Sequence, residues 1–304
     1  MTDDADVLPP RGRAIGHYLG NLAVRGMFGL ALALPYRLRV PFIGWLAAHV
    51  IAPVAGWRRR VRTNLAHVCP DLPAAEVRRL MRAVPDNAGR TLIETYSGED
   101  FAARARAAPV EGPGLAALEQ ARAEGRAVIL VTAHFGNYNA IRANLRTHGH
   151  EMGVLYRRMS NPYFNAHYVQ ALAEGGQPLF EQGRRGMMQL VRHLRAGGIL
   201  GILTDLYARD GIPLPFFGKP ARTSLVTAEL ALKYNAVLIP TFALRDDTGL
   251  GFRILMQEPV VHGDPAAMTQ EVSDRLEALV RDHMDQWFWI HRRWKFAERP
   301  GEQN

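Results

Sequence analysis

Three short apolar runs, each leading into polar side chains, constrain the fold of this chain more than any other feature of its sequence. In the clearest one, apolar and β-branched residues from Ala127 to Val131 precede a polar, glycine-containing turn at His134. Such runs are typical of strands buried in a parallel sheet. Residues Ala140 to Leu145 then follow a helical pattern. The sequence therefore predicts an α/β fold with His134 at the carboxyl end of a strand, where α/β sheets hold their ligands.

The other two runs lead into charged side chains. One, GVLYRRM, ends in Tyr156, Arg157 and Arg158, and the other, GGILGILTDLYARDG, passes through Asp205. Parallel strands bring their carboxyl ends to the same edge of a sheet, so the three strand ends together predict a functional site. An aspartate on an apolar strand must be paired or must face a cleft. Asp205 could pair with Arg157 or support His134, and the sequence does not choose between them.

The N-terminal region predicts attachment to a membrane surface. Residues 1–13 are acidic and then proline-rich, which is typical of a loose tail. Two apolar stretches follow, 21–35 and 41–57, and prolines and arginines interrupt both before they reach the ~20 apolar residues that span a bilayer. A basic cluster beside a tryptophan comes next: Trp57, Arg58, Arg59, Arg60 and Arg62. We therefore predict a membrane-associating helical segment at 14–67, the alternative being core helices with a solvated basic face.

The net charge indicates an anionic partner. The chain carries a formal charge of +8 and has a pI near 10.0, so nucleic acid, anionic lipid and an acidic carrier protein all qualify. No sequence pattern of a nucleic-acid-binding fold occurs, which argues against nucleic acid. Cys69 is the only cysteine, and no His and Cys residues have the spacing of zinc ligands. The sequence therefore predicts neither an intramolecular disulfide nor a metal site.

Two segments offer further candidate contacts to an anionic substrate. Residues 216–220 form an aromatic, turn-rich loop that contains Gly218, and Thr223 is a suitable N-cap for a helix predicted to start near it. The amino end of that helix could face a phosphate, or the helix could simply be capped. The motif GRRG, with Arg184 and Arg185, opens another predicted helix, for which a solvated basic face is the alternative.

The C-terminal segment 285–295 combines tryptophans with basic side chains. Its sequence, DQWFWIHRRWK, places three tryptophans among His291, Arg292, Arg293 and Lys295. This density of aromatic and basic residues is typical of an interfacial belt, or of a groove wall that contacts lipid phosphates.

Four motifs occur in order along the chain: HFGNYN at 134–139, YRRM at 156–159, TDLYARDGIPLPFFGKPART at 204–223 and WFWIHRRWK at 287–295. This ordered set resembles the late lipid A acyltransferases, a group within the lysophospholipid acyltransferase superfamily. The similarity extends over nearly the whole chain. The resemblance implies a glycerol-phosphate-acyltransferase-like α/β domain at 68–304, with a mixed central sheet flanked by helices and a groove for hydrocarbon.

The resemblance also implies a function. Members of this family move a fatty acyl chain from an acyl carrier protein thioester to a hydroxyl of a lysolipid-like acceptor, without a metal or redox cofactor. The expected partners are acyl carrier protein, or acyl-CoA as co-substrate, an anionic lysolipid or lipid A precursor, and the cytoplasmic face of the inner membrane. The same chemistry on a lyso-aminolipid or lysophospholipid is one alternative. A catalytically silent lipid-binding protein of the membrane is another.

Residue 139 departs from the family's HX4D/E motif. By resemblance, His134 is the general base and an Asp or Glu five positions later orients it, but this chain has Asn139. An asparagine can hold one ring nitrogen but cannot neutralise the charge that develops on the imidazole. Asn139 could mark an engineered substrate trap, a tolerated natural variant or an inactive homologue. If residue 139 has the orienting role, Asn139→Asp should raise the rate at least ~10²-fold.

Two more positions are assigned by the resemblance. Arg157 matches the arginine of the family's Tyr-Arg motif, and Arg158 replaces the proline that usually follows. A planar guanidinium suits bidentate contact with phosphate, although a surface arginine at a strand end is the alternative for Arg157. Asp205 matches the aspartate of a strand-end Asp-Gln or Asp-His pair, in which Leu206 replaces the second residue.

Overall fold

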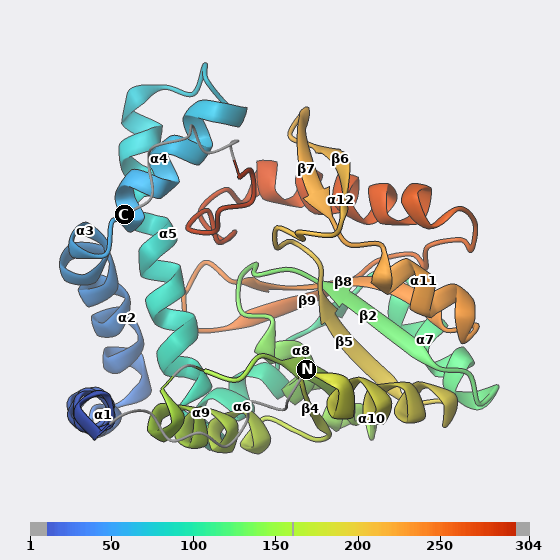
Figure 1. Ribbon diagram of the computed structural model, residues 1–304, viewed down its shortest axis with the longest axis horizontal. Helices are drawn as coiled ribbons and strands as arrows, with labels where there is room; N and C mark the ends of the chain where they lie inside the picture. The colour runs from blue at the N-terminus through green and yellow to red at the C-terminus, as the bar shows by residue number, and fades with distance from the viewer. Residues whose placement is uncertain (1–10, 160, 296–304) are drawn as a thin grey trace.

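The structure is a computed structural model that describes residues 11–159 and 161–295. The helices within residues 11–68, which we call the N-terminal block, lie beside an α/β sheet domain (Figure 1). The helices are α1 (Arg11–Leu32), α2 (Tyr36–Leu46), η2 (Ala47–Ile51), α3 (Ala52–Val54), α4 (Trp57–Val68), α5 (Ala74–Thr95), α6 (Gly98–Arg106), α7 (Gly114–Ala123), α8 (Asn139–Leu145), η3 (Arg146–His148), α9 (Pro162–Glu174), α10 (Arg184–Arg195), α11 (Val226–Lys233) and α12 (Pro265–Asp282). The strands are β1 (Val110–Glu111), β2 (Val128–Thr132), β3 (Met152–Tyr156), β4 (Leu179–Glu181), β5 (Ile199–Leu203), β6 (Ile212–Phe216), β7 (Lys219–Thr223), β8 (Val237–Arg245) and β9 (Phe252–Met256). Of the predicted tail, residues 1–10 lie outside the described part, and the remainder begins α1.

The central sheet is mixed and has helices on both faces, which confirms the predicted α/β architecture of a mixed sheet flanked by helices. Its strand order is β1-β9-β8-β2-β5-β3-β4, and β9 runs antiparallel to β8 whereas the other neighbouring strands run parallel. Alternate residues of β2 contribute to opposite core layers, because successive side chains of a strand point to opposite faces. Val128 and Leu130 join the layer that includes α7 and α8, whereas Ile129 and Val131 join the layer of α10 and α11.

The strand register brings the predicted site residues to one edge of the sheet. The three apolar runs form β2, β5 and β3, which are neighbours in that order. Thr132 at the end of β2 pairs with Leu203 at the end of β5, and the backbone N–H of Thr204 donates to the carbonyl of Thr132 at 3.1 Å. The next residues of both strands therefore leave the sheet side by side. This register places His134 near Asp205, although 71 residues separate them.

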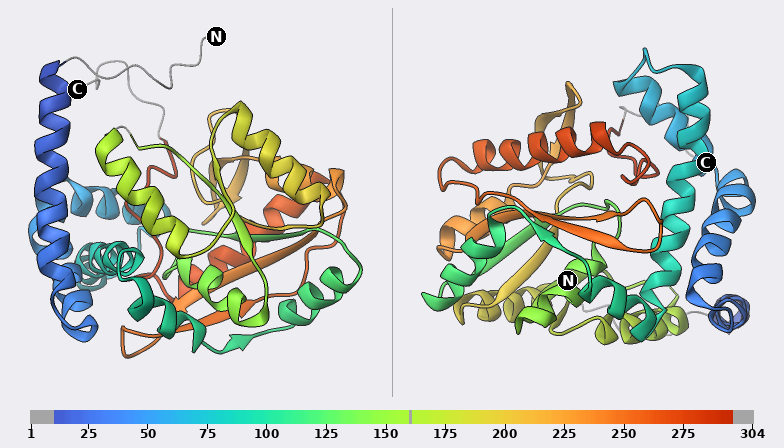
Figure 2. Two further views of the ribbon diagram at one scale, coloured as in Figure 1. Left: turned by 90° about the horizontal axis from the view of Figure 1, so that it is seen from below. Right: turned by 180° about the vertical axis from the view of Figure 1, so that it is seen from behind.

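The N-terminal block packs against the long helix α5. Helix α2 crosses α5 closely at Gly89, where a Cβ atom would lie 2.6 Å from the Cβ of Ala47 and 2.7 Å from the carbonyl oxygen of Ile43. Only glycine permits this approach, so any side chain at 89 would push the two helices apart. Figure 2 shows α1 as a long helix along one edge of the molecule. Among the described residues, no single helix has both the length and the apolarity needed to cross a membrane, and Tyr36–Val54 with Trp57–Val68 meets these criteria only as a pair bent by 84°.

Apolar side chains on α2 remain exposed. Leu38, Phe42 and Trp45 are each about half exposed and follow one another at spacings of four and three residues, so they lie on one side of the helix. We call these three residues the α2 stripe. The indole of Trp57 is instead partly buried, in contact with a core cluster. The exposed tryptophan of the block is therefore Trp45 and not Trp57.

The segment around Gly218 forms a β-hairpin, which corrects one prediction. Strands β6 and β7 pair in antiparallel register, and Gly218, with a φ of +68°, lies in the turn between them. The following helix, α11, begins at Val226, so the prediction that Thr223 caps it is wrong. Thr223 is the last residue of β7 and is buried, because antiparallel pairing with Ile212 extends the strand to this point.

Candidate active site

The turn after β2 holds its shape because a glycine lies where no side chain fits. Gly136 has a φ of +53°, and a Cβ on it would lie 1.9 Å from the carbonyl oxygen of Ala243 in β8. Backbone hydrogen bonds fix both sides of this residue: Gly136 N donates to the carbonyl of Gln286, and Asn137 N donates to that of Ala243. The loop is therefore fastened to β8 and to the C-terminal segment, and His134 stands at its beginning.

His134 and Asp205 form a hydrogen-bonded pair. His134 Nδ1 lies 2.9 Å from Asp205 Oδ1, and the His134 backbone N–H donates to Asp205 Oδ2 at 2.9 Å. The carboxylate side chain is 0% exposed, whereas the imidazole is 23% exposed. The imidazole is therefore the accessible member of the pair, and the carboxylate lies behind it. Of the two partners that the sequence left open for Asp205, the structure has His134.

A tryptophan from the C-terminal segment completes the hydrogen bonding of the carboxylate. Trp287 Nε1 donates to Asp205 Oδ2 at 3.0 Å, and Phe288 N donates to the carbonyl of His134 at 2.9 Å. Trp287, Trp289 and Trp294 are buried, so the expectation of an interfacial belt made of these residues is wrong. Sequence reasoning missed Trp287 as a partner of Asp205. The signal was present, because a buried carboxylate needs N–H donors and indole is a donor without an acceptor.

The surroundings keep Asp205 ionised. Burial by itself would raise the pKa of Asp205, but the nearby His134 imidazole and the hydrogen bonds from His134 hold this pKa below its ordinary value, with a further contribution from His291. An ionised carboxylate only accepts hydrogen bonds, so His134 Nδ1 carries the proton that joins the two groups. In the neutral imidazole, Nε2 is then unprotonated and can accept a proton. This is the tautomer that a general base requires.

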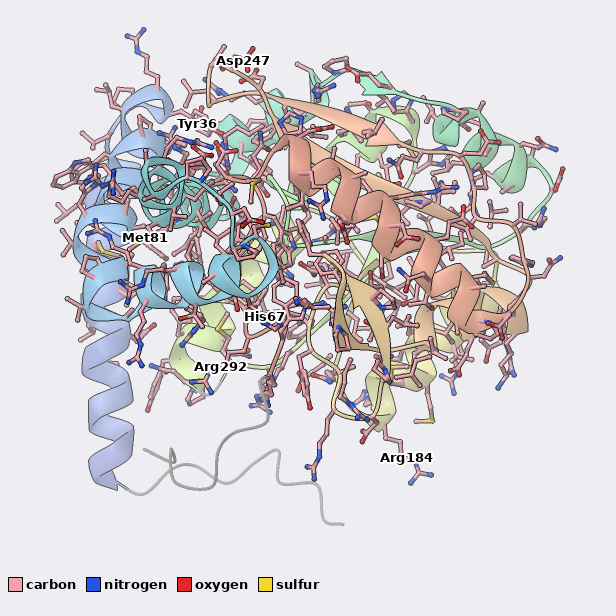
Figure 3. The ribbon with its side chains drawn as sticks, turned by 90° about the horizontal axis from the view of Figure 1, so that it is seen from above. Tyr36, His67, Met81, Arg184, Asp247 and Arg292 are labelled. Carbon is pink, nitrogen blue, oxygen red and sulfur yellow. The ribbon has the colours of Figure 1, made fainter. Side chains whose placement is uncertain are left out.

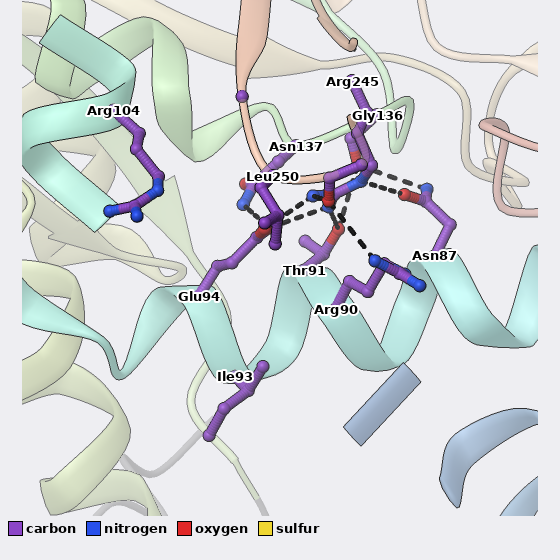
Figure 4. Close-up of polar contacts among 12 residues, drawn as sticks. Asn87, Arg90, Thr91, Ile93, Glu94, Arg104, Gly136, Asn137, Arg245 and Leu250 are labelled. Atoms are coloured by element: carbon purple, nitrogen blue, oxygen red, sulfur yellow. Dashed lines mark hydrogen bonds and ion pairs between the residues drawn. The ribbon is translucent and has the colours of Figure 1, made fainter. Parts of the chain in front are cut away.

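A buried ion pair supports the loop from behind (Figure 4). Glu94 of α5 and Arg245 of β8 form two hydrogen bonds, of 2.5 and 2.7 Å, and both side chains are buried. Asn137 Nδ2 donates to Glu94 Oε2 at 2.8 Å, and Tyr36 of α2 donates to Glu94 Oε1 at 3.2 Å. Arg245 Nε also donates to Asn87 at 2.9 Å. The ion pair therefore links the loop of His134 to both the sheet and the N-terminal block.

Asn139 points to a different neighbour. Its side-chain amide donates to Thr95 Oγ1 at 3.2 Å, and its backbone N–H donates to the side chain of Asn137 at 3.1 Å. As the first residue of α8, it lines a cavity of about 580 Å³ together with residues of α6 and α9. The carboxylate that contacts the imidazole comes from β5, and residue 139 faces α5.

The other predicted contact residues lie in three places. Tyr156 ends β3 and donates to Glu181 of β4 at 3.0 Å, and the following residues, Arg157 and Arg158, are exposed. Arg184 is the first residue of α10 and also is exposed, as Figure 3 shows. Gly218 lies at the tip of the β6–β7 hairpin.

Two neighbouring arginines of the C-terminal segment have different environments. Arg293 is 2% exposed and donates to the carbonyls of Leu206 and Arg222 and to Thr223 Oγ1, so it fastens the hairpin to this segment. Burial lowers the pKa of Arg293 to about 10. Arg292, in contrast, projects from the surface (Figure 3).

The basic cluster of α4 has mixed surroundings. Arg58 donates to the carbonyl of Ala48 at 2.6 Å, and Arg60 donates to that of Ile290 at 3.2 Å, whereas Arg59 and Arg62 are exposed. Burial, and then the charge of Arg292, lower the pKa of Arg60. Arg60 and Arg292 therefore form a pair of like charges beside the C-terminal segment. No group of His, Cys, Asp or Glu side chains suited to a metal ion occurs within residues 11–159 and 161–295.

Comparison with known proteins identifies related sequences over most of the chain. A family model described as bacterial lipid A biosynthesis acyltransferase matches residues 11–296. The phosphatidylinositol mannoside acyltransferase of Mycobacterium tuberculosis (strain CDC 1551 / Oshkosh) is 28% identical over 79% of this chain and 78% of its own length. The lipid A biosynthesis acyltransferase of Haemophilus influenzae is 25% identical, with 87% and 85% covered. The lipid A biosynthesis lauroyltransferase of Escherichia coli (strain K12) is 24% identical, with 89% of each chain covered.

Proposed function

Because this chain belongs to the bacterial lipid A biosynthesis acyltransferase family and is thus an acyltransferase, we propose that it moves a fatty acyl chain from acyl carrier protein to a hydroxyl of a lipid A precursor. The observation that carries this proposal is the pair of His134 and Asp205. Its imidazole is partly exposed, its carboxylate is buried, and the hydrogen bonds fix the tautomer of a base. Acyl transfer to a hydroxyl needs such a base.

We propose the following steps for the reaction. His134 Nε2 takes the proton of the acceptor hydroxyl as the oxygen attacks the thioester carbon. Asp205 stabilises the imidazolium, because its negative charge lies 2.9 Å from Nδ1. The tetrahedral intermediate then expels the thiolate, which receives the proton from His134. In this proposal Asp205 supplies the carboxylate that the motif assigns to position 139, so Asn139 is compatible with an active enzyme.

The charges near the site suit an anionic acceptor. Arg60 and Arg292 lie close enough for Arg292 to lower the pKa of Arg60, and two like charges in such proximity favour an anion between them. A lipid phosphate is an anion of this kind. Arg60 donates to the carbonyl of Ile290 in the C-terminal segment, and Phe288 of that segment donates to the carbonyl of His134. We therefore propose that Arg60 and Arg292 bind a phosphate of the acceptor.

A second acceptor is supported by one specific comparison. Two relatives from Mycobacterium tuberculosis named phosphatidylinositol mannoside acyltransferase are 28% identical to this chain, and a third of that name, from Mycolicibacterium smegmatis, is 24% identical. The relatives named for lipid A biosynthesis are 24–25% identical. Both kinds of acceptor present a sugar hydroxyl beside a phosphate on a lipid. The proposed second candidate is therefore the same transfer to a mannosylated phosphatidylinositol.

The function is tested by an assay of purified protein with acyl carrier protein thioesters and a panel of acceptors. The panel contains a lipid A precursor, a mannosylated phosphatidylinositol, a lyso-aminolipid and a lysophospholipid. Ester formation with the lipid A precursor, abolished by His134→Ala, is the expected result. Transfer confined to another acceptor would replace the lipid A assignment. No ester with any acceptor from either acyl carrier protein or acyl-CoA would contradict the proposal.

We further propose that the α2 stripe inserts into the surface of the inner membrane from the cytoplasmic side. Leu38→Asp with Phe42→Asp should weaken binding to anionic vesicles at least ~10-fold, because each apolar side chain contributes about 1 kcal/mol or more on leaving water, and 1.4 kcal/mol is tenfold. Flotation of the protein with vesicles measures this. The matched control is Met188→Asp with Val261→Asp, which also charges two exposed apolar positions but lies on the sheet domain. Equal loss in both double variants would contradict a specific role for the stripe.

A further inference from the structure

A second histidine lies directly against His134. The rings of His291 and His134 are 4.5 Å apart between centroids and meet edge to face at 75°. The ring of Phe288 contacts His291 from another direction, also at 4.5 Å. The backbone holds this position, because His291 N donates to the carbonyl of Phe288 at 3.1 Å and Asn64 Nδ2 of α4 donates to the carbonyl of His291 at 2.8 Å. These hydrogen bonds hold the backbone of His291 beside the site, and its imidazole packs between Phe288 and His134.

One ring nitrogen of His291 has an unused hydrogen-bonding capacity. Within residues 11–159 and 161–295, its Nε2 is buried and makes no hydrogen bond to the protein. Buried polar groups are nearly always hydrogen-bonded, and an unpartnered one at an active site calls for an explanation. The rings of Phe288 and His134 pack against the His291 ring, and neither side chain forms a hydrogen bond with His291 Nε2. A substrate atom bound beside His134 would supply the missing partner.

His291 also has the charge state that suits this position. Burial, and then the proximity of His134, lower the pKa of His291 to about 4, with a further contribution from Arg60, whereas Asp205 acts in the opposite direction. The imidazole of His291 is therefore neutral at neutral pH. A neutral imidazole does not oppose the positive charge that forms on His134, and it retains one N–H to donate. Neutral imidazoles with lowered pKa values can polarise a substrate carbonyl in this way.

We propose that His291 contacts the acyl donor and that its Nε2–H donates a hydrogen bond to the thioester carbonyl oxygen. This inference rests on the proposed acyl transfer. As the acceptor oxygen loses its proton to His134 Nε2 and bonds to the carbonyl carbon, the electrons of the C=O π bond move onto the oxygen that His291 contacts. When the C=O bond re-forms, the C–S bond breaks, and the thiolate takes the proton from His134. His291 keeps its own proton throughout.

Two substitutions separate hydrogen bonding from packing. His291→Phe keeps a ring but removes the N–H, and it should lower kcat about 10²- to 10³-fold, as the loss of one oxyanion donor does. His291→Gln places an amide N–H at a similar reach and should stay within ~10-fold of the parent. His148→Phe, which changes an exposed histidine of η3, is the matched control and should leave kcat unchanged. The Michaelis constant for the acceptor should stay nearly constant in all three, because the contact is with the donor.

The outcomes distinguish this inference from the function on which it rests. Full activity of His291→Phe alongside an inactive His134→Ala would overturn the role of His291 and leave the acyltransfer in place. Equal losses of kcat in His291→Phe and His291→Gln would show that His291 acts by packing and not by donating a hydrogen bond. A second measurement does not depend on turnover. Nitrogen NMR records the histidine signals with and without an acylated carrier protein in which a CH2 group replaces the thioester sulfur. The His291 signal, assigned from its absence in His291→Phe, should shift on binding, and an unchanged signal would contradict the contact.

Discussion

Replacing Asp205 by asparagine should lower kcat about 10⁴-fold, the loss that the corresponding change causes in the serine-protease triad. The reason lies in the hydrogen bonds of the carboxylate. One amide oxygen would have to accept from the His134 backbone and from Trp287 Nε1, which leaves the amide N–H2 facing His134 Nδ1. Nδ1 would then have to be the acceptor, and the proton would move to Nε2. The imidazole would present the wrong tautomer to the acceptor hydroxyl. Single-turnover kinetics at saturating donor measure this effect.

Asn139→Asp is the matched control for that experiment. It introduces a carboxylate at the position that the sequence motif assigns to the acid, but the structure has residue 139 bonded to Thr95. We expect this variant to change kcat by less than about threefold and not to rescue Asp205→Asn, since a carboxylate helps only where it reaches the imidazole. A gain of ~10²-fold, as the motif by itself suggests, would show that residue 139 orients His134 during the reaction and that Asp205 does not suffice.

Removing the carboxylate of Glu94 should produce the largest loss of stability. Glu94→Ala leaves the guanidinium of Arg245 buried without its charged partner and deprives Asn137 and Tyr36 of their acceptor. Breaking a buried ion pair in this way typically costs about 3–5 kcal/mol, a large part of the roughly 5–15 kcal/mol that stabilises a folded domain. Urea unfolding, followed by circular dichroism, measures the free energy of unfolding. Activity should fall as well, because Asn137 belongs to the loop of His134.

Two comparisons test whether the loss comes from the buried charge. Glu111→Ala removes one partner of the exposed ion pair with Arg253 and should cost less than about 1 kcal/mol, since solvent screens such pairs. Adding Arg245→Met to Glu94→Ala removes the unpaired cation and should restore much of the lost stability, because an apolar side chain tolerates burial. A Glu94→Ala variant as stable as Glu111→Ala would contradict the supporting role of the ion pair.

Local sequence patterns were sufficient to predict the strands β2, β3 and β5 and part of the candidate site. The apolar runs predicted β2, β3 and β5 to within a residue or two, because a strand buried on both faces requires a continuous apolar sequence. The common direction of parallel strands was sufficient to bring His134 and Asp205 to one edge of the sheet. The same reasoning was wrong at Thr223, where antiparallel pairing with β6 extends a strand through a residue that has the properties of a helix cap. Pairing across a hairpin is not visible in the local sequence of one strand.

The sequence by itself determined the mixed α/β sheet and the family, and it predicted the candidate histidine of the site, since these depend on periodicity and on motifs read along the chain. Only the tertiary structure decided which groups surround that histidine. Asp205 reaches His134 through the register of β2 and β5, and Trp287 and His291 reach the site from a segment more than a hundred residues away. The same packing buries the tryptophans that the sequence placed at a membrane surface, and turns Asn139 towards Thr95. Contacts between distant segments depend on how the layers pack, and no pattern within a single segment carries that information.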